Sequence, residues 1–501
     1  MDLPCYSLLL PLFVFIFFLH KWFFTSSNIQ KRLLPPSPRK LPIIGNLHQL
    51  GTHPHRSLHK LSQKYGPVML LHLGSKPVLV ASSVEAARDI MKTHDLVWSS
   101  RPNSRMADRL LYGSKDVTFS PYGEYWRQIK SVTVLHLLNN KRVQSFRDVR
   151  EEETSKMIEK IRQGCDSSSS VIDLRDLFSS LTNNIISIVA LGRNYDEGNK
   201  NGVNAKATIE KLLSLLGAFD IGDYIPWLEG VNKITGLDTK VEKVAKDLDT
   251  FLETVFEEHM IMNKKRETKS FVDVLLEIQN GKETGFPLER DSLKALLVDS
   301  FAAGTDTTYT TLEWTMTELL RHPRVMETLQ NEVRGLAQGK AEIKEDDLGN
   351  MRYLKATIRE SLRLHPPLPL LIPRESTEDV KLLDYHIPAK TQVIINAWSI
   401  GRDPLLWENP EEFRPERFLN SDIHVRGLNF ELIPFGAGRR GCPGITFAIM
   451  VNELALARIV HKFNFALPQG IKEEELDMTE STGITIRRKS PLLAIATPCS
   501  N

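Results

Sequence analysis

Two short apolar runs near the start of the chain, separated by turn residues, predict a small β-rich region. Two strands are predicted at Val68 to Leu73 and at Pro77 to Ala81, on either side of Gly74-Ser75-Lys76. From Val84 to Thr93 the apolar positions recur with helical spacing, which predicts an amphipathic helix. This part of the sequence therefore predicts a hairpin followed by a helix.

Helical spacing dominates from about Glu124 to Arg363, and the loops between the predicted helices are short. Two long helical stretches are predicted at Val241 to Arg266 and at Ser292 to Arg334. After Pro366 the pattern predicts short strands at Val380 to Leu383 and Gln392 to Asn396, a proline-rich loop to Pro434, a helix from about Gly444 to Phe463 and a terminal strand region. We therefore expect a mainly α fold with small β-sheets (α+β) and no internal domain boundary.

The first 24 residues are the most apolar part of the chain. Leu3 to Phe24 consists almost entirely of Leu, Phe, Ile and Val, and a membrane-spanning helix needs ~20 such residues. A cleaved signal peptide and a buried helix are the alternatives. A signal peptide usually begins with basic residues and ends at a small-residue cleavage site, whereas this run ends in Trp22-Phe23-Phe24. We therefore predict a retained membrane anchor over residues 1–24.

A basic, proline-rich segment follows the predicted anchor. Its basic residues directly after the apolar run are Lys21, Lys31, Arg32, Arg39 and Lys40. Positive charge beside a span marks the cytoplasmic side, so we expect a single-pass protein with the rest of the chain in the cytoplasm. Leu34-Pro35-Pro36-Ser37-Pro38 favours a stiff spacer, although an ordinary linker is equally compatible. We expect residues 25–45 to form this hinge and residues 46–501 to form a single domain.

Charge and cysteine content exclude some classes of function. Lys plus Arg number 64 and Asp plus Glu number 62, so no excess of positive charge favours nucleic acid as a partner. The four cysteines are Cys5, Cys165, Cys442 and Cys499. Their scattered positions indicate neither a disulfide framework nor a zinc cluster. A reducing compartment and one chemically special thiol fit this distribution.

The segment around Cys442 is the strongest candidate site. Glycines and arginines surround Cys442 from Phe435 to Gly444, directly before an apolar helix. A helix N-terminus favours an ionised sulfur, which iron requires as a ligand, and Arg440 can neutralise a haem propionate. The same glycines match G-x-G-x-x-G, but too little sequence follows for a nucleotide domain. An inert buried cysteine is the remaining alternative.

The run F-x-x-G-x-R-x-C-x-G is complete between Phe435 and Gly444 and resembles the signature of the cytochrome P450 superfamily. This resemblance implies the cytochrome P450 fold and a b-type haem, iron protoporphyrin IX, whose iron is ligated by Cys442. Phe435 and Arg440 are implied to lie against the haem. The implied activity is monooxygenation, because a thiolate ligand favours cleavage of the O–O bond.

A second motif lies in the long predicted helix, from Phe301 to Thr308. Glycine and threonine are poor choices in mid-helix, so we expect a local opening there. The opening would leave a groove near Ala303 and Gly304 for dioxygen, with Asp306 and Thr307 placed to deliver protons. A packing kink without chemistry is the alternative. The segment resembles the oxygen-binding motif of the family.

Further segments are similar to haem-supporting parts of the family. Trp126 and Lys130 resemble a tryptophan and a basic residue that meet a propionate, with lysine where arginine is commoner; core packing is the alternative for Trp126. Pro373-Arg374 is similar to a propionate-binding strand. Glu360-Ser361-Leu362-Arg363 and Pro415-Glu416-Arg417-Phe418 resemble a structural Glu-Arg-Arg triad.

Over the whole chain the sequence is similar to plant microsomal A-type enzymes of the 71 clan. This similarity implies location in the endoplasmic reticulum membrane and electrons from NADPH-cytochrome P450 reductase, with cytochrome b5 as a further partner. It implies a small hydrophobic specialised metabolite, such as a terpenoid, alkaloid or coumarin, as substrate. The expected pocket residues are Leu296, Phe301, Leu370, Leu371, Ile372 and, by family position, residues 106–119, 208–216 and 482–484. A haem-thiolate isomerase or dehydratase and a haem sensor are the rival functions.

Overall fold

The computed structural model describes residues 34–165, 171–195, 205–262, 268–281 and 287–499. The predicted membrane anchor and the first part of the predicted hinge lie outside these residues. None of the helices in the described ranges combines the length and the apolar composition of a membrane span.

The described chain is mainly helical. Its α-helices are α2 (Pro54–Tyr65), α3 (Val84–Arg88), α4 (Arg105–Leu110), α5 (Glu124–Val132), α6 (Asn140–Ser145), α7 (Arg147–Cys165), α8 (Leu174–Leu191), α9 (Ala205–Leu216), α10 (Ile221–Tyr224), α11 (Val231–Ile234), α12 (Leu237–Met262), α13 (Phe271–Asn280), α14 (Arg290–Arg321), α15 (Pro323–Ala337), α16 (Arg352–Leu364), α17 (Ala397–Ile400) and α18 (Ile445–Lys462). The predicted mainly α fold with small sheets is confirmed.

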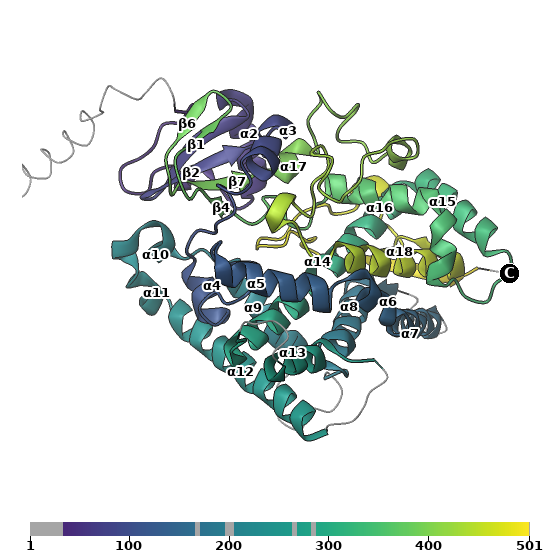
Figure 1. The fold of residues 1–501 in the computed structure, drawn as a ribbon. Helices are drawn as coiled ribbons and strands as arrows, with labels where there is room; N and C mark the ends of the chain where they lie inside the picture. The colour runs from purple at the N-terminus through teal and green to yellow at the C-terminus, as the bar shows by residue number, and fades with distance from the viewer. Residues whose placement is uncertain (1–33, 166–170, 196–204, 263–267, 282–286, 500–501) are drawn as a thin grey trace, which may run out of the picture.

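The strands form three small sheets. They are β1 (Val68–Leu73), β2 (Lys76–Ala81), β3 (Val171–Asp173), β4 (Arg374–Glu375), β5 (Val380–Leu382), β6 (Tyr385–Ile387), β7 (Gln392–Ile395), β8 (Phe463–Ala466) and β9 (Leu493–Pro498). The largest sheet has the order β1-β2-β7-β4, with β2 parallel to β7 and the other pairs antiparallel. It lies with α2, α3 and α17 on one side of the molecule, away from the main body of helices (Figure 1).

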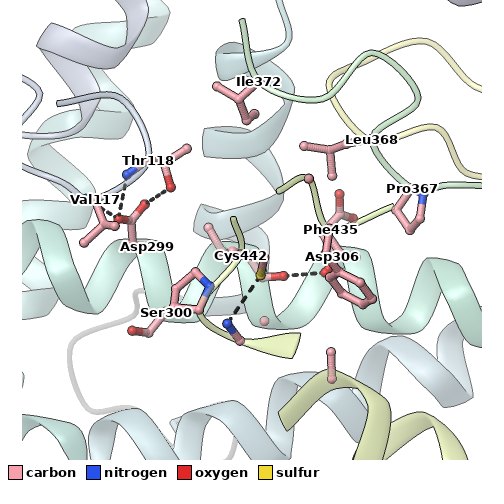
Figure 2. Close-up of a pocket in the computed structure, with 18 of the residues that line it drawn as sticks. Val117, Thr118, Asp299, Ser300, Asp306, Pro367, Leu368, Ile372, Phe435 and Cys442 are labelled. Atoms are coloured by element: carbon pink, nitrogen blue, oxygen red, sulfur yellow. Dashed lines mark hydrogen bonds between the residues drawn. The ribbon is translucent and has the colours of Figure 1, made fainter. Parts of the chain in front are cut away.

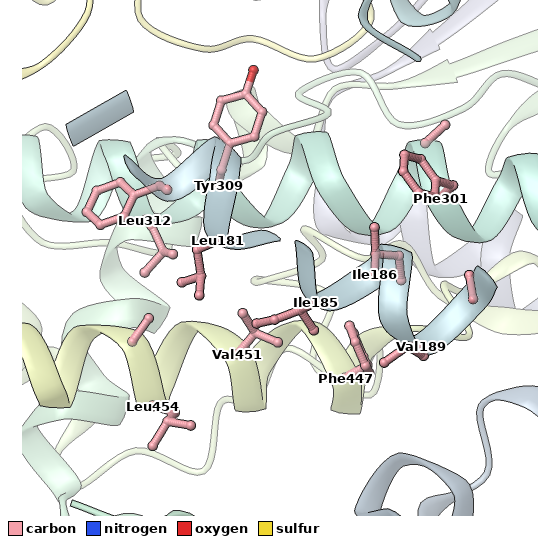
Figure 3. Packing of buried hydrophobic residues seen from close by; sticks show 14 of the residues in the cluster. Leu181, Ile185, Ile186, Val189, Phe301, Tyr309, Leu312, Phe447, Val451 and Leu454 are labelled. Carbon is pink, nitrogen blue, oxygen red and sulfur yellow. The ribbon is translucent and has the colours of Figure 1, made fainter. Parts of the chain in front are cut away.

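The central helix α14 packs against α8 and α18. Apolar side chains from all three helices interdigitate, as Figure 3 shows for Ile185 and Val189 of α8, Leu312 of α14, and Phe447 and Val451 of α18. These residues are fully buried or nearly so, and burial of such apolar surface is the main stabilising contribution in a fold of this kind. The packing holds α14 in place along the site described below.

Most predicted elements are confirmed, with shifted ends. The predicted helical stretch Ser292 to Arg334 consists of two helices, because α14 ends at Arg321 and α15 begins at Pro323. Proline at position 323 lacks the amide donor that a continuous helix needs there. The predicted helix Val84 to Thr93 is α3 followed by a π-helical turn at Asp89–Thr93.

Candidate active site

One cavity of about 290 Å³ beside α14 collects the side chains that the sequence analysis singled out. It is lined by Trp126, Lys130, Ala303, Gly304, Asp306, Thr307, Arg374, Phe435, Arg440 and Cys442. These residues come from α5, α14, β4 and the segment before α18. Figure 2 shows Cys442 with Asp299 and Asp306 of α14, and with Leu368 and Ile372 from the loop after α16. The fold therefore brings all of the predicted catalytic and haem-binding residues to one place.

The segment before α18 presents the Cys442 sulfur to the cavity. The Cys442 amide donates to the Phe435 carbonyl at 3.0 Å, and the Gly444 amide donates to Cys442 Sγ at 3.3 Å. Gly438 has a φ of 67°, and a side chain at this position would overlap the Met91 carbonyl. The tight path of this segment therefore depends on glycine at position 438.

The environment of Cys442 suits a metal-bound thiolate more than a free one. The side chain is exposed to the cavity, but the surrounding protein encloses it, and this burial raises the pKa of the thiol. The Gly444 amide and Lys130 lower the pKa but do not offset burial. The predicted stabilisation of the thiolate by the helix N-terminus is present, but burial has the larger effect on the pKa. A bound iron ion would supply the missing positive charge, so the sulfur fits that role.

The predicted propionate-binding side chains all reach protein groups. Lys130 Nζ donates to the Gly441 carbonyl at 3.0 Å, and burial lowers its pKa to about 8. Arg374 donates to Asp95 Oδ1 at 2.9 Å and to the Ala437 carbonyl at 2.7 Å. Lys130 and Arg374 therefore hold the cysteine-bearing segment. Their contact with a propionate stays a prediction.

Arg440 has an unusual set of neighbours. Its guanidinium donates to the carbonyls of Ser99 at 2.7 Å, Val117 at 3.1 Å and Ser120 at 2.6 Å. The same group lies 4.1 Å from the ring centroid of Trp126. Burial and other nearby positive charge lower the pKa of Arg440 to about 9. Carbonyl oxygens hold this cation in place, and the carboxyl groups of Asp116 and Asp95 offset its charge only in part.

Arg101, which the sequence analysis missed, lies on the same cavity wall. It donates to the carbonyls of Thr118, Ile372 and Pro373 at 2.7 to 2.8 Å. Burial and then Arg440 lower its pKa well below the ordinary value. In the described part of the chain neither arginine forms an ion pair with a carboxylate. A ligand carrying two carboxylates, such as haem, would offset this buried positive charge.

The cavity-facing part of α14 is helical throughout, so the predicted local opening is wrong. The Thr307 hydroxyl donates to the Ala303 carbonyl at 2.7 Å, which satisfies the hydroxyl without breaking the helix. A Cβ at Gly304 would lie 3.0 Å from Ile186 Cδ1 of α8. Glycine at this position therefore allows α8 to approach closely, besides lining the cavity.

Asp306 is buried on the cavity wall, close to Tyr309 of the same helix. The Tyr309 hydroxyl accepts a hydrogen bond from Arg487 at 2.5 Å. Burial and then Asp306 raise the pKa of Tyr309. Asp306 and Thr307 both line the cavity, and Arg487, which bonds Tyr309, is partly exposed.

Comparison with known proteins is consistent with this geometry. The family model described as Cytochrome P450 matches residues 35–494. This chain belongs to the cytochrome P450 family. It is 71% identical to Cytochrome P450 71A4 of Solanum melongena over 100% of both chains. It is 57% identical to a norfluorocurarine oxidase of Strychnos sp over 98% of this chain and 97% of the relative, and 52% identical to a 3-beta-hydroxylase of Tanacetum parthenium over 97% of each.

The P450 is thus a monooxygenase of the plant 71 clan, and it binds haem b. The residues around its cavity fit this cofactor. A cysteine sulfur faces the cavity, and the cations that line it exceed their carboxylate partners.

Asp299 of this P450 was also missed by the sequence analysis. Its Oδ2 accepts from the amides of Val117 at 2.7 Å and Thr118 at 3.3 Å, and its Oδ1 accepts from the Thr118 hydroxyl at 2.9 Å. Burial raises the pKa of Asp299 to about 6. The carboxyl group holds one wall of the cavity against α14. An acidic residue on the apolar side of a predicted helix was the available signal.

Some of the residues predicted to form the substrate pocket line the cavity. The cavity is lined by Leu296, Leu371, Ile372, Leu111, Val117, Thr118, Phe119, Leu213, Leu216 and Ile484. Phe301 and Leu370 are not among its lining residues. Phe301 is buried in the core with residues of α8 (Figure 3), and Leu370 packs against the cluster that contains β1 and β2. The two predictions fail because each side chain lies on the opposite face of its segment.

The P450 also contains the predicted Glu-Arg-Arg triad. Arg363 donates to both carboxylate oxygens of Glu360, at 2.7 and 2.8 Å, and Arg417 Nε donates to Oε1 at 3.0 Å. The Glu360 and Arg363 side chains are both 0% exposed. This buried cluster joins α16 to the loop that precedes the cysteine-bearing segment.

Proposed function

We propose that this P450 uses O2 and electrons from NADPH-cytochrome P450 reductase to oxidise a small hydrophobic plant specialised metabolite. The observation that carries the proposal is that a cysteine sulfur, an acid-alcohol pair and an apolar wall face one cavity. In hydroxylation or epoxidation, one oxygen atom enters the substrate and the other leaves as water with two electrons and two protons. In desaturation or ring closure, both oxygen atoms leave as water, with two electrons, two protons and two hydrogen atoms of the substrate.

Cys442 is the proposed iron ligand, and its sulfur faces the cavity. Arg440, Arg374, Lys130 and Trp126 are the proposed contacts of the haem propionates, together with Phe435 against the ring. Bound haem supplies the activation of dioxygen. The protein contributes the orientation of the cofactor and the positive charge that the propionates require.

Asp306 and Thr307 are the proposed source of protons, beside Ala303 and Gly304 as the place where dioxygen binds. The Thr307 hydroxyl now donates to the Ala303 carbonyl at 2.7 Å. Rotation of this side chain would turn the hydroxyl proton toward the cavity. Asp306 can supply the next proton, because its carboxyl group lies on the cavity wall close to Tyr309, which bonds the partly exposed Arg487.

A terpenoid, alkaloid or coumarin is the proposed substrate class. The cavity wall is mainly aliphatic, with Leu213, Leu216, Leu296 and Ile484 among its residues, and such a wall favours small apolar ligands. Two relatives are named norfluorocurarine oxidase and 3-beta-hydroxylase. The proposed product is an alcohol, an epoxide, a desaturated compound or a ring-closed compound.

The proposed location is the endoplasmic reticulum membrane, with residues 1–24 as anchor, residues 25–45 as hinge and residues 46–501 as a cytoplasmic catalytic domain. Exposed apolar side chains near the hinge support this. Ile43 is 48% exposed, and Gly45 beyond it pairs with Leu73 of β1. In the turn after β1, the Ser75 hydroxyl donates to the carbonyl of Tyr224 in α10. Trp227, just beyond α10, is 69% exposed. Such side chains favour contact with lipid.

The test is reductase-dependent consumption of NADPH and oxygen by the full-length enzyme across a panel of plant metabolites. Consumption coupled to an oxidised product supports the proposal, and addition of cytochrome b5 tests the second electron donor. Conversion without oxygen or NADPH would indicate an isomerase or dehydratase. Binding without conversion would indicate a haem sensor. Asp306 and Thr307 both line the cavity, and the presence of this acid and alcohol favours the oxygen-dependent reaction.

A further inference from the structure

Residues 480–488, near the C-terminus, form a hairpin-like loop whose tip enters the cavity. Its two ends are paired, because Glu480 and Arg488 form an antiparallel bridge. Just inside them, the Ser481 amide donates to the Arg487 carbonyl at 2.8 Å. At the tip, Ile484 and Thr485 line the cavity. We call residues 480–488 the C-terminal hairpin.

The C-terminal hairpin is held at its base by the start of α2, far away in the sequence. The carboxylate of Glu480 accepts from His55 Nε2 at 3.0 Å, from Arg56 Nε at 2.7 Å and from Arg56 Nη2 at 3.0 Å. The Glu480 carbonyl lies 3.1 Å from His53 Nε2. Three residues at the beginning of one helix therefore contact a single residue of the hairpin.

Glu480 is built into this contact and is not a surface charge. Its side chain is 5% exposed, and that of His55 is 1% exposed. Burial by itself raises the pKa of the Glu480 carboxyl, but hydrogen bonds from His55 and Arg56 bring the pKa well below its usual range. Removal of the carboxylate would leave the buried His55 without its acceptor and the half-exposed Arg56 without its counter-charge.

The C-terminal hairpin has further contacts with α8, α14, the end of α9 and the loop after α16. The Ile486 amide donates to the Pro367 carbonyl at 2.8 Å, and Trp314 Nε1 of α14 donates to the Ile486 carbonyl at 3.0 Å. At the tip, a Cβ at Gly217 would lie 2.5 Å from the Ile484 amide nitrogen, so the end of α9 touches the tip. The tip is therefore close-packed, and a small displacement of the base changes the space that Ile484 and Thr485 leave.

We propose that Glu480 is a positioning residue that fixes the tip of the C-terminal hairpin through His55 and Arg56, and thereby sets the size of molecule that the cavity accepts. Glu480 itself is not among the residues that line the cavity. The proposal rests on the haem-binding cavity and not on the proposed substrate class. It also ties the cavity to α2, which follows shortly after the predicted membrane hinge.

The test compares two azole probes that bind haem iron through nitrogen, titrated into full-length ferric enzyme and followed by the Soret shift. Imidazole is small and need not reach the hairpin, whereas clotrimazole is bulky and fills the cavity. In Glu480→Gln we expect the Kd of clotrimazole to rise about tenfold, with that of imidazole unchanged within about twofold. Hydrogen exchange of residues 481–487 should become faster. Glu474→Gln, at an exposed position nearby, is the matched control and should change neither quantity.

Arg56→Gln is the second variant, because the Arg56 side chain is 47% exposed and its replacement leaves the His55 contact in place. It should shift clotrimazole binding in the same direction by a smaller factor. Equal weakening of both azoles, or unchanged exchange and unchanged clotrimazole binding in the folded variants, would overturn the proposal. The proposal would also be overturned if hydrogen exchange of residues 481–487 in the wild type were as fast as in an unstructured peptide. Azole binding needs no turnover, so a failure of the proposed oxidation would be recognised separately.

Discussion

Replacement of Glu360 by glutamine should destabilise the haem-binding half of the enzyme. The Glu360 carboxylate accepts two hydrogen bonds from Arg363, one from Arg417 and one from the Arg414 amide, at 2.7 to 3.0 Å. Glutamine keeps one of the two acceptor oxygens and places an NH2 group among guanidinium donors. Glu360→Gln therefore leaves N–H groups unpaired and two arginine charges without their counter-charge.

The size of the effect follows from the burial of the cluster. Breaking a fully buried ion pair costs ~3–5 kcal/mol, a large fraction of the ~5–15 kcal/mol that stabilises a typical folded protein. We expect Glu360→Gln to lower the urea midpoint strongly and to reduce the amount of haem bound after expression. Soret absorbance during urea titration and the spectrum of the reduced carbonyl adduct measure both.

Glu408→Gln is the control for this prediction. Glu408 is paired with Arg414 at 2.7 Å, but its side chain is 76% exposed. Because water and salt screen exposed pairs, the control should leave the urea midpoint almost unchanged. If the two variants lower the midpoint equally, burial does not decide the strength of these pairs and the reasoning is refuted.

Three further predictions concern the cavity. Cys442→Ser should lose the red-shifted Soret band of the reduced carbonyl adduct; persistence of this band would exclude Cys442 as the iron ligand. Thr307→Ala should keep haem but divert oxygen to hydrogen peroxide, and an unchanged ratio of product to oxygen consumed would contradict its role in proton delivery. Burial raises the pKa of the Asp299 carboxyl group from 3.8 to about 6. The folded protein therefore binds the carboxyl proton more tightly than the unfolded chain does, and its stability falls as the pH rises between these two pKa values. Asp299→Asn keeps an acceptor for the Val117 and Thr118 amides, and its Tm should depend less on pH over this range than that of the wild type; equal pH dependence would refute the assignment.

The local elements were predictable because their signals are local. The short apolar run from Val68 to Leu73 predicted β1 with its observed ends. The predicted helix from Gly444 to Phe463 is α18 with one residue fewer at each end. The break between α14 and α15 was also predictable, because Pro323 cannot donate the hydrogen bond that a continuous helix needs. The expected opening near Gly304 was wrong because a threonine hydroxyl found its acceptor inside an intact helix.

The faces of the elements were harder to predict. Phe301 and Ala303 are two residues apart on α14, yet Phe301 is buried in the core and Ala303 lines the cavity. A helix turns by about 100° per residue, so hydrophobicity alone does not tell which apolar side chain meets a ligand. That choice depends on where α8 and α18 pack.

By itself, the sequence determined the family, the order of the elements and the identity of the cysteine-bearing segment. Only the tertiary structure decided that Arg440 lies among the carbonyls of Ser99, Val117 and Ser120, more than 300 residues away in the chain. It also placed Arg101 and Asp299 on the cavity wall. The physical reason is that periodicity and motifs express short-range backbone preferences, whereas the partner of a buried charge is set by long-range packing of segments that no local pattern relates.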